Sequence, residues 1–467
     1  MTQAPLVELT PTVRARNASA LIVAIALIEC LSGITQGYLS PIIPGLGGQF
    51  HISDATVNGI FVISNVAFAV FAPVIPRLGD SFGHGRVLRI SIGLTAIGAV
   101  VMAVVPNLTT VIIGVVMITC VVGFIPLMMG IMRVAIPGHA KSGTGVMVGV
   151  LMLTVGLGGL FAGYVGQHKP TLGFWVAVPF AALAIVGSFL LPATDVPTRE
   201  PVAVRPLLSC TLGLIGLVTA LSMGPQWGWG DVRTLGAGVV GLVLLAAWIF
   251  QDACGHHRFV DLGIFRTGHL RVNTLASFFF GFASISFLGT NGIFLASDRS
   301  TTGYGFGYDS LQIAWVVAAT MAASLVASFV AGRLLGPLGG RRALLVSALL
   351  LVLGYVFLLT MRSSLGEYAV GAAFFGLGMG SYQAVIRPLS IEGVPESETA
   401  ASAGVNELSL SIGAAIGTAA IELLQQSNAH EGRLTGHGLD LILSMLAGAA
   451  LLALVISFFY RPVEQPE

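Results

Sequence analysis

The chain has 467 residues, of which 55% are hydrophobic and 9% are charged, and its formal net charge at pH 7 is +1. Soluble domains carry charge on about a quarter of their residues, so this composition excludes a protein whose whole surface faces water. A charge so close to neutral gives no electrostatic basis for binding nucleic acid. The four cysteines lack the spacing of metal ligands, and we expect neither a metal site nor a disulfide framework.

Long apolar segments follow one another along the chain, each close to the roughly 20 residues that a helix needs to cross about 30 Å of hydrocarbon. We predict fourteen spanning helices, near residues 18–40, 54–76, 87–106, 109–132, 143–166, 171–192, 206–224, 234–251, 273–296, 310–333, 342–361, 367–387, 400–424 and 438–460. Arg14 and Arg16 precede the first segment, which has no small-residue cleavage site, so we interpret it as a retained span and not as a signal peptide.

The placement of basic residues predicts the orientation. Of the 22 Lys and Arg residues, 17 fall on one side of the membrane if both termini are cytoplasmic, and we place Arg387, at the end of span twelve, among them. The positive-inside rule therefore predicts cytoplasmic termini and an even number of spans. The five basic residues on the other side are Lys169, Arg233, Arg299, Arg362 and Arg433.

Two polar segments, 193–205 and 252–271, divide the series of spans. We predict an N-terminal six-helix bundle in residues 1–192, a linker with two inserted helices and a cytoplasmic loop in 193–271, and a C-terminal six-helix bundle in 272–467. Two related bundles around a midplane site are a common plan for secondary transporters.

Glu29 lies about eleven residues into the first span, and no opposite charge in that span balances it. Ionisable residues at this depth are costly and rare, so each is a candidate functional residue. Glu29 is the leading candidate for binding a proton or attracting a cationic substrate. The alternative is a structural carboxyl that stays protonated and hydrogen-bonded within the bundle.

The turn after span two reads Pro-Arg-Leu-Gly-Asp-Ser-Phe-Gly-His-Gly-Arg over residues 76–86. A carboxylate such as Asp80 can face a helix N-terminus or an arginine of the neighbouring bundle, and such a contact would latch one conformation. We therefore predict a conformational switch formed by Asp80, Gly83 and Arg86. The alternative is an ordinary tight turn with a solvated aspartate.

Span five carries glycines at close spacing, which flatten one helix face and allow close packing against the opposite half. The glycine ladder is Gly145, Gly149, Gly158, Gly159 and Gly163. General small-residue packing explains this pattern equally well.

These motifs resemble the major facilitator superfamily, specifically its fourteen-span drug:proton antiporter branch. The family's loop after span two follows Gly-x-Leu-Ala-Asp-x-x-Gly-Arg-Arg, and the chain matches it at Leu78, Asp80, Gly83 and Arg86, with Pro76 in place of the leading glycine. The family's span five ends Gly-Pro-x-x-Gly-Gly; here Gly159 occupies the proline position. Residues 226–230, Gln-Trp-Gly-Trp-Gly, also resemble the insert region of that branch.

The resemblance implies a monomeric transporter of the bacterial cytoplasmic (inner) membrane that works without a cofactor. Its partners would be a small-molecule substrate, protons and the lipid bilayer. It would export a lipophilic or drug-like compound by proton antiport with alternating access, a function associated with multidrug efflux and antibiotic resistance.

Further polar residues within spans are candidates for the proton or substrate site. They are Gln36 in span one, Asn291 in span nine, Gln383 in span twelve, and Asn406 and Glu407 in the cytoplasmic part of span thirteen. The alternative for each is a hydrogen bond that ties two helices together.

Span four lacks the arginine that proton antiporters of this family carry, because residues 108–132 contain no charge and Thr119 occupies the equivalent position. Proton coupling through Glu29 and a proton-independent facilitator or uptake carrier therefore both stay open. A membrane enzyme or lipid-handling protein on the same fold is a third alternative, but a catalytic site needs converging titratable groups and the spans offer one midspan carboxylate without a partner. The sequence does not identify the substrate.

Overall fold

The computed structural model describes residues 11–39, 42, 46, 49–51, 54–136, 140–166, 169–191, 203–254, 268–308, 310–395, 399–430 and 433–461. Within these residues, thirteen helical segments are long and apolar enough to cross a membrane. The remaining predicted span, near 54–76, lies in the helix α3 (Asp54–Phe82). The prediction of an all-α membrane fold with fourteen spanning helices is confirmed.

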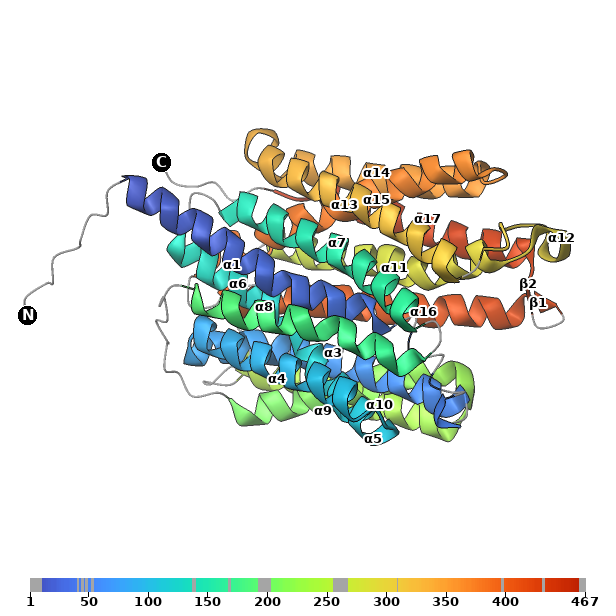
Figure 1. The fold of residues 1–467 in the computed structure, drawn as a ribbon, viewed down its shortest axis with the longest axis horizontal. Helices are drawn as coiled ribbons and strands as arrows, with labels where there is room; N and C mark the ends of the chain where they lie inside the picture. Colours follow the sequence, from blue (N-terminus) through green and yellow to red (C-terminus); the bar gives the residue numbers. More distant parts are fainter. Residues whose placement is uncertain are drawn as a thin grey trace, which may run out of the picture.

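The N-terminal spans run roughly parallel along the long axis of Figure 1. They are α1 (Pro11–Gly37), α3, α4 (His84–Val104), the composite α5 (Leu108–Ile118), η1 (Thr119–Gly123) and α6 (Phe124–Ala135), then α7 (Ala140–Gly166), and η3 (Pro170–Val176) with α8 (Ala177–Phe189). Because lipid offers no hydrogen bonds, such apolar segments must satisfy their backbone groups internally, and a helix does so.

The rest of the chain consists of the inserted helices, the C-terminal spans and a small hairpin. They are α9 (Val204–Trp227), α10 (Val232–Cys254), α11 (Gly268–Ala296), the short α12 (Arg299–Thr302), α13 (Ser310–Leu338), α14 (Gly340–Thr360), α15 (Leu365–Leu389), α16 (Thr399–Ser427), β1 (Ala429–His430), β2 (Arg433–Leu434) and α17 (Gly436–Phe458). The two strands pair antiparallel, with Ala429 opposite Leu434. We call the end at which α1 begins the N-terminal face, and the end with the hairpin the opposite face (Figure 1).

Span four is not one continuous α-helix, because a 3₁₀ segment, Thr119–Gly123, separates α5 from α6. Pro126 stands in the first turn of α6 and has no backbone N–H, so the carbonyl four residues before it loses its α-helical partner. The irregular segment begins at Thr119 and lies in the middle of the span.

The two predicted halves meet mainly along two helix pairs. Helix α7 packs against α13, and α3 packs against α16. The inserted helices α9 and α10 pack on each other along the lower edge of the bundle in Figure 1, and α9 also contacts α3 and α16. The insert therefore lies against both halves. The division into residues 1–192, 193–271 and 272–467 stays a prediction, since the polar segments that define it fall largely outside the described residues.

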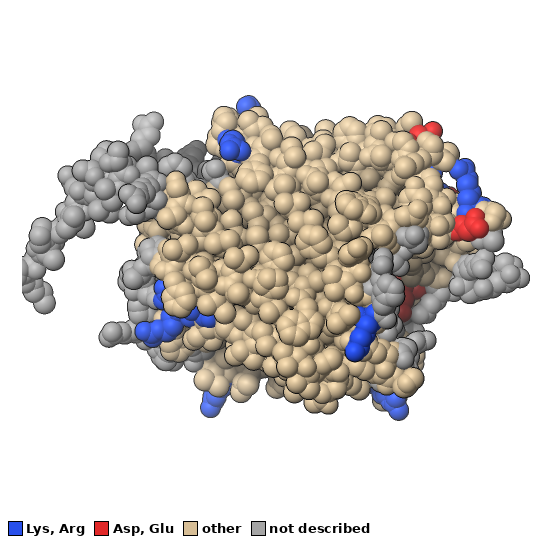
Figure 2. All heavy atoms as spheres, viewed as in Figure 1, with Lys and Arg blue, Asp and Glu red and all other residues tan. Residues whose placement is uncertain are grey.

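The surface between the two faces is apolar, as a lipid-facing belt requires. In Figure 2 the visible charged side chains lie mainly toward the ends of the molecule, and the area between them is almost free of charge. Large hydrophobic side chains are exposed there, including Val239, Phe250 and Val346. Such an exposed apolar surface is stable in hydrocarbon and would aggregate in water.

The glycine ladder of α7 makes two different kinds of contact. A Cβ added at Gly145 would lie 2.8 Å from the backbone oxygen of Ser328 in α13, across the boundary between the halves. A Cβ at Gly159 would meet only the carbonyl oxygen of Gly37, at an ordinary 3.5 Å. The requirement for glycine is therefore strict at Gly145 and weak at Gly159.

We predict that Gly145→Ala destabilises the protein, whereas Gly159→Ala does not. Alanine gains about 0.5–1 kcal/mol over glycine within a helix. At Gly145 this gain is exceeded by the ~1–3 kcal/mol cost of overpacking against a fixed backbone atom. Thermal unfolding in detergent should show a lower midpoint for Gly145→Ala and an unchanged or higher one for Gly159→Ala. Equal midpoints would contradict the close approach of α7 and α13.

Candidate functional site

Asp80 joins the two halves at the N-terminal face. Its side chain is 2% exposed. One carboxylate oxygen accepts a hydrogen bond from the backbone N–H of Ala400 at 3.2 Å, and the other accepts one from Ala401 at 2.7 Å. These amides belong to the first turn of α16, where unpaired N–H groups and the helix dipole favour a negative charge. A helix N-terminus and an arginine of the neighbouring bundle were the two partners expected for Asp80. The structure shows the helix N-terminus.

The turn after α3 holds Asp80 in this position. Gly83 has a φ of 101°, a conformation that suits glycine, and it ends α3 and starts α4. His84 then lies one turn beyond Asp80, and its Nε2 is 2.8 Å from the carboxylate. Arg86, the third residue predicted for the switch, has an exposed side chain.

Arg133, at the end of α6, makes a second contact across the same face. It donates to the hydroxyl of Thr399 at 2.8 Å and to the backbone carbonyl oxygens of Ile391 and Val394 in the connection between α15 and α16. The sequence analysis did not single out Arg133 as a site residue. We call Asp80 and Arg133, with their partners at the start of α16, the latch. It ties the two predicted halves together at the N-terminal face.

A buried ion pair lies deeper in the C-terminal half. The Nε of Arg387 in α15 is 2.7 Å from one carboxylate oxygen of Glu407 in α16, and its Nη2 is 3.2 Å from the other. Its Nη1 donates to Gln383, one turn earlier on α15. Arg387 and Glu407 are 3% and 6% exposed. We call Gln383, Arg387 and Glu407 the ion-pair cluster.

The burial of this cluster goes beyond what the sequence predicted. Arg387 was counted with the basic residues of the cytoplasmic side, at the end of span twelve, but α15 continues to Leu389 and the guanidinium is buried. Glu407 was placed in the cytoplasmic part of span thirteen, and it is buried as well. Mutual pairing explains the burial of both, since a guanidinium and a carboxylate that neutralise each other tolerate burial that neither would tolerate alone.

Glu29 in α1 is fully buried, with an exposed fraction of 0%. The hydroxyl of Ser32, one turn further along, is close enough to influence the carboxyl, but neither carboxyl oxygen accepts a hydrogen bond of full geometry. The charged groups that act on it electrostatically are Arg387 and Glu407.

A cavity of about 460 Å³ lies between the halves, on the side of the cluster away from the latch. Helices α1, α3, α9, α11 and α16 line it together with the end of α5 and the 3₁₀ segment of span four. Its polar side chains are Thr35, Gln36, Ser64, Asn65, Thr119, Ser222, Gln226, Ser411, Thr418 and Glu422. Gln36 and Asn65 are exposed, so solvent reaches the cavity.

Glu422 is the one ionisable side chain among the described residues that line the cavity, and no Lys or Arg lines it. The sequence analysis missed Glu422, which falls in the last turn of the predicted span 400–424. It also missed the contribution of the insert, because Ser222 and Gln226 reach the cavity from α9.

The other predicted residues lie in different surroundings. Gln36 lines the cavity and donates to Ser32 at 3.0 Å. Asn406 is buried and accepts hydrogen bonds from Asn273 and Ser277 of α11. The described contacts of Asn406 therefore hold α16 against α11.

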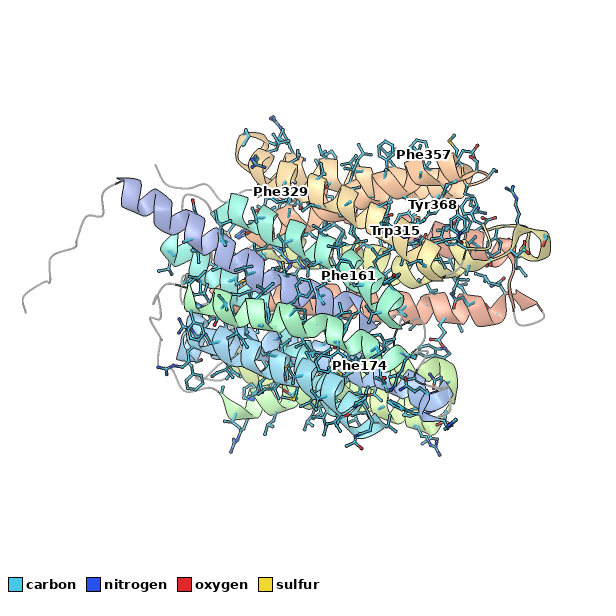
Figure 3. The ribbon with its side chains drawn as sticks, in the orientation of Figure 1. Phe161, Phe174, Trp315, Phe329, Phe357 and Tyr368 are labelled. Atoms are coloured by element: carbon cyan, nitrogen blue, oxygen red, sulfur yellow. The ribbon has the colours of Figure 1, made fainter. Side chains whose placement is uncertain are left out.

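Asn291 lies elsewhere in the C-terminal half. It accepts a hydrogen bond of 2.8 Å from the hydroxyl of Tyr368 on α15, labelled in Figure 3. It lines small cavities of about 10 Å³, far smaller than the cavity between the halves. The structure does not bring Asn291 together with Glu29 and the ion-pair cluster.

Comparison with known proteins places this architecture among transporters. The chain is 22% identical over 395 residues to the tetracenomycin C resistance and export protein of Streptomyces glaucescens, covering 82% of the chain and 71% of the relative. It is 23% identical to the multidrug resistance protein Stp of Mycobacterium tuberculosis, covering 81% and 70%. The lincomycin resistance protein LmrB of Listeria monocytogenes is 23% identical, but the match covers only 46% of the chain and 47% of LmrB.

Solved structures share the fold at low sequence identity. The human organic anion transporter MFSD10 superposes with a TM-score of 0.66 at 16% identity, covering 96% of the chain and all of MFSD10. The proton:xylose symporter XylE gives a TM-score of 0.64 at 14% identity, covering 94% and 95%. The family model described as Major Facilitator Superfamily matches residues 25–297 and 274–467. The chain therefore belongs to the Major Facilitator Superfamily and is a secondary transporter, not an enzyme.

Proposed function

We propose that this protein exports a small lipophilic or drug-like compound in exchange for protons, with its N-terminal face in the bacterial cytoplasm. The observation that carries the proposal is the position of Glu29, a buried carboxyl between a solvent-accessible cavity and the latch. A proton site at this place can be reached from one side of the membrane at a time, as alternating access requires.

The state of the two faces defines the step of the cycle. The latch closes the N-terminal face, and the cavity contains residues from the parts of α1, α3 and α16 nearer the opposite face. These two features support an outward-facing state, from which substrate leaves and Glu29 takes up a proton. Rocking of the halves would then open the N-terminal face and release that proton inside.

The names of the relatives favour export of natural products over uptake of nutrients. The proteins from Streptomyces, Listeria and Mycobacterium are described by resistance to tetracenomycin C, lincomycin and several drugs. These relatives and the two inserted helices support a narrower assignment within the superfamily, to the fourteen-span drug:proton antiporter branch.

The cavity supports a lipophilic cation, or a neutral compound, as the substrate. Its volume of about 460 Å³ lies in the range of roughly 300–1,000 Å³ that drug-sized ligands occupy. Most of its surface is apolar, with hydroxyl and amide groups at intervals and a single carboxylate, Glu422. An anion would find no opposite charge among the described lining residues.

Glu422→Gln should therefore change substrate selectivity. We expect the apparent affinity for a lipophilic cation such as ethidium to fall about tenfold, the effect of losing one partly screened ion pair of ~1.4 kcal/mol. Affinity for a neutral drug should change less than about twofold. Competition transport assays with both compounds measure the ratio of the two apparent affinities, with Glu422→Asp as the charge-preserving control. An equal loss for both compounds would remove the charge-based explanation.

Proteoliposomes with an imposed pH gradient test the function itself. In inside-out oriented protein, an acidic interior should drive accumulation of the exported compound above its equilibrium level. Accumulation only up to equilibrium, whatever the gradient, would identify a proton-independent facilitator. Accumulation in the reverse direction would identify an uptake carrier.

A further inference from the structure

We propose that a groove between α13 and α14 binds one acyl chain of an anionic phospholipid, whose phosphate pairs with Arg333 and Arg342. The groove lies on the outside of the C-terminal half and shares no lining residue with the cavity between the halves. The proposal is therefore independent of the transported compound and of the exchange of protons at Glu29.

The groove exists because α13 and α14 both pack on α15 but make few contacts with each other. Its volume is about 180 Å³. Small side chains keep its floor low, among them Ala327, Ala343 and Ser347, which are almost completely buried. Val330 and Val346 at its rim are 49% and 51% exposed, so the groove is open to its surroundings. An empty apolar hollow loses dispersion contacts, and in a bilayer hydrocarbon chains are the material that can restore them.

The depth of the groove matches one leaflet of the bilayer. On α13 it extends from Val326 to Leu338, which are twelve residues or about 18 Å apart along the helix axis. Half of a hydrocarbon core of ~30 Å is ~15 Å. On α15 it extends from Leu377, near the middle of that helix, to Val385, near the end. The groove therefore runs from the N-terminal face to about the middle of the membrane, as an acyl chain of that leaflet does.

The end of the groove at the N-terminal face is positively charged. Arg333, Arg341 and Arg342 have exposed side chains there, and residues 310–366 contain no Asp or Glu. In Figure 2, blue side chains at the upper left lie over the turn between α13 and α14. Arginines at this depth extend their guanidinium groups to the interface, where each attracts anionic lipid. An apolar groove with a basic end fits a phospholipid that carries a net negative charge.

Two of the three arginines flank the groove. Arg342 lies one turn before Val346 on α14, and Arg333 lies three residues after Val330 on α13. Residues three or four apart are neighbours on a helix surface, so each arginine lies beside a valine of the rim. A phosphate at the end of the groove is therefore placed between two guanidinium groups from different helices.

Arg341 lies on another side of α14 and provides an internal control. It precedes Ala343 on the groove floor by two residues, which is about 200° around the helix. Its guanidinium carbon lies 5.0 Å from the ring centroid of Phe458 in α17. Arg341 thus shares the membrane depth of Arg342 without facing the groove.

The opposite face of α13 lies at the boundary between the halves. A Cβ added at Gly145 of α7 would lie 2.8 Å from the backbone oxygen of Ser328 and 3.1 Å from the Cα of Gly332. A lipid in the groove therefore packs behind α13 where α7 approaches it. A ligand that binds only the folded protein raises its stability, so occupation of the groove should be visible as a higher unfolding temperature.

The test titrates the delipidated protein in detergent with dioleoyl phosphatidylglycerol, which is anionic, or dioleoyl phosphatidylcholine, which is zwitterionic and has the same chains. Native mass spectrometry counts the bound lipid, and thermal unfolding reports its effect on stability. We expect phosphatidylglycerol to bind about tenfold more tightly and to raise the midpoint more. Glycerol 3-phosphate, which has no chain, should leave the midpoint unchanged, and stabilisation by it alone would contradict a lipid site.

Charge variants test the two arginines. Arg333→Gln combined with Arg342→Gln should bring the affinity for phosphatidylglycerol to within about twofold of that for phosphatidylcholine. Arg333→Lys with Arg342→Lys, and separately Arg341→Gln, should keep the preference. All these positions are exposed, so folding is not at risk. An equal loss in Arg341→Gln and in the double glutamine variant would show diffuse surface charge and overturn the paired site.

A groove variant tests the place of the chain. Val330→Trp puts an indole into the groove and should weaken the binding of both lipids about tenfold while leaving the arginines in place. Val356→Trp, at a position of α14 that is 44% exposed and does not line the groove, should bind both as the native protein does. Native binding of both lipids by Val330→Trp, or equal affinity of the native protein for the two lipids, would overturn the proposal.

Discussion

Asp80→Asn is expected to open the N-terminal face and to lower gradient-driven transport by about tenfold or more. The carboxylate accepts hydrogen bonds from the amides of Ala400 and Ala401, and it is almost completely buried. A hydrogen bond to a charged group contributes about 1.5–3 kcal/mol. Asparagine keeps one acceptor oxygen but loses the charge that the helix N-terminus favours.

Loss of one such bond is enough to redistribute the states. A change of about 1.4 kcal/mol alters a two-state population tenfold, so a latch that holds the outward-facing state loses much of its bias. A cysteine introduced at Ala403 of α16, which is 3% exposed, should then react rapidly with a membrane-impermeant maleimide. Unchanged labelling and transport in Asp80→Asn would show that the contact is an ordinary helix cap without a role in the cycle.

The control for this substitution is Asp440→Asn. Asp440 pairs with Arg362 near the opposite face, and its side chain is 50% exposed. An exposed ion pair contributes about 0–1 kcal/mol. The same chemical change should therefore leave transport and labelling close to those of the native protein. The comparison separates the place of Asp80 in the latch from the general effect of removing a carboxylate.

Glu29→Gln is expected to abolish proton-driven accumulation while leaving substrate equilibration intact. Glutamine has the shape of a protonated glutamate but cannot ionise, so it keeps this position permanently neutral. Because both carboxyl oxygens of Glu29 lack a hydrogen bond of full geometry, no described partner is left unpaired by the change. The variant should therefore fold, because burying an uncharged amide costs less free energy than burying a charge.

Counterflow and gradient-driven uptake, measured in the same vesicles, separate these two properties. Glu29→Gln should show counterflow near the native rate and no accumulation in response to pH. Glu422→Gln serves as the comparison, since it removes a carboxylate from the cavity and should alter selectivity without abolishing coupling. Gradient-driven accumulation that survives in Glu29→Gln would reduce Glu29 to a structural carboxyl.

The sequence predicted the parts of the fold that depend on local composition. Long apolar segments specify spanning helices because lipid leaves the backbone no other partners, and thirteen of these segments meet the criteria within the described residues. The contact between Asp80 and a helix of the other half was among the expected alternatives, since only a few partners suit a carboxylate at a tight turn.

The ion-pair cluster could not be predicted in the same way. Arg387 lies beside Pro388 at the end of span twelve, where a basic residue ordinarily marks the cytoplasmic side. Its partner Glu407 belongs to the next helix and Glu29 to the first, and hydropathy fixes neither the rotation of a helix nor its neighbours. Only the folded structure shows that Arg387 and Glu407 pair with each other.

Glu422 and the contribution of α9 were missed for related reasons. A glutamate in the last turn of a span resembles an ordinary interfacial residue. Whether its side chain reaches a cavity depends on how the other helices that line the cavity are arranged. The break in span four was visible in principle, because Pro126 has no N–H to donate within the helix.

Proton release on substrate binding tests most directly whether Glu29 exchanges a proton for substrate. Purified protein in weakly buffered detergent solution, with a pH-indicating dye, should release about one proton per chain when a transported compound is added, because binding and proton loss are linked at a single carboxyl. Glu29→Gln should bind the compound and release none. Binding without proton release by the native protein, or equal release by Glu29→Gln, would contradict proton exchange at Glu29.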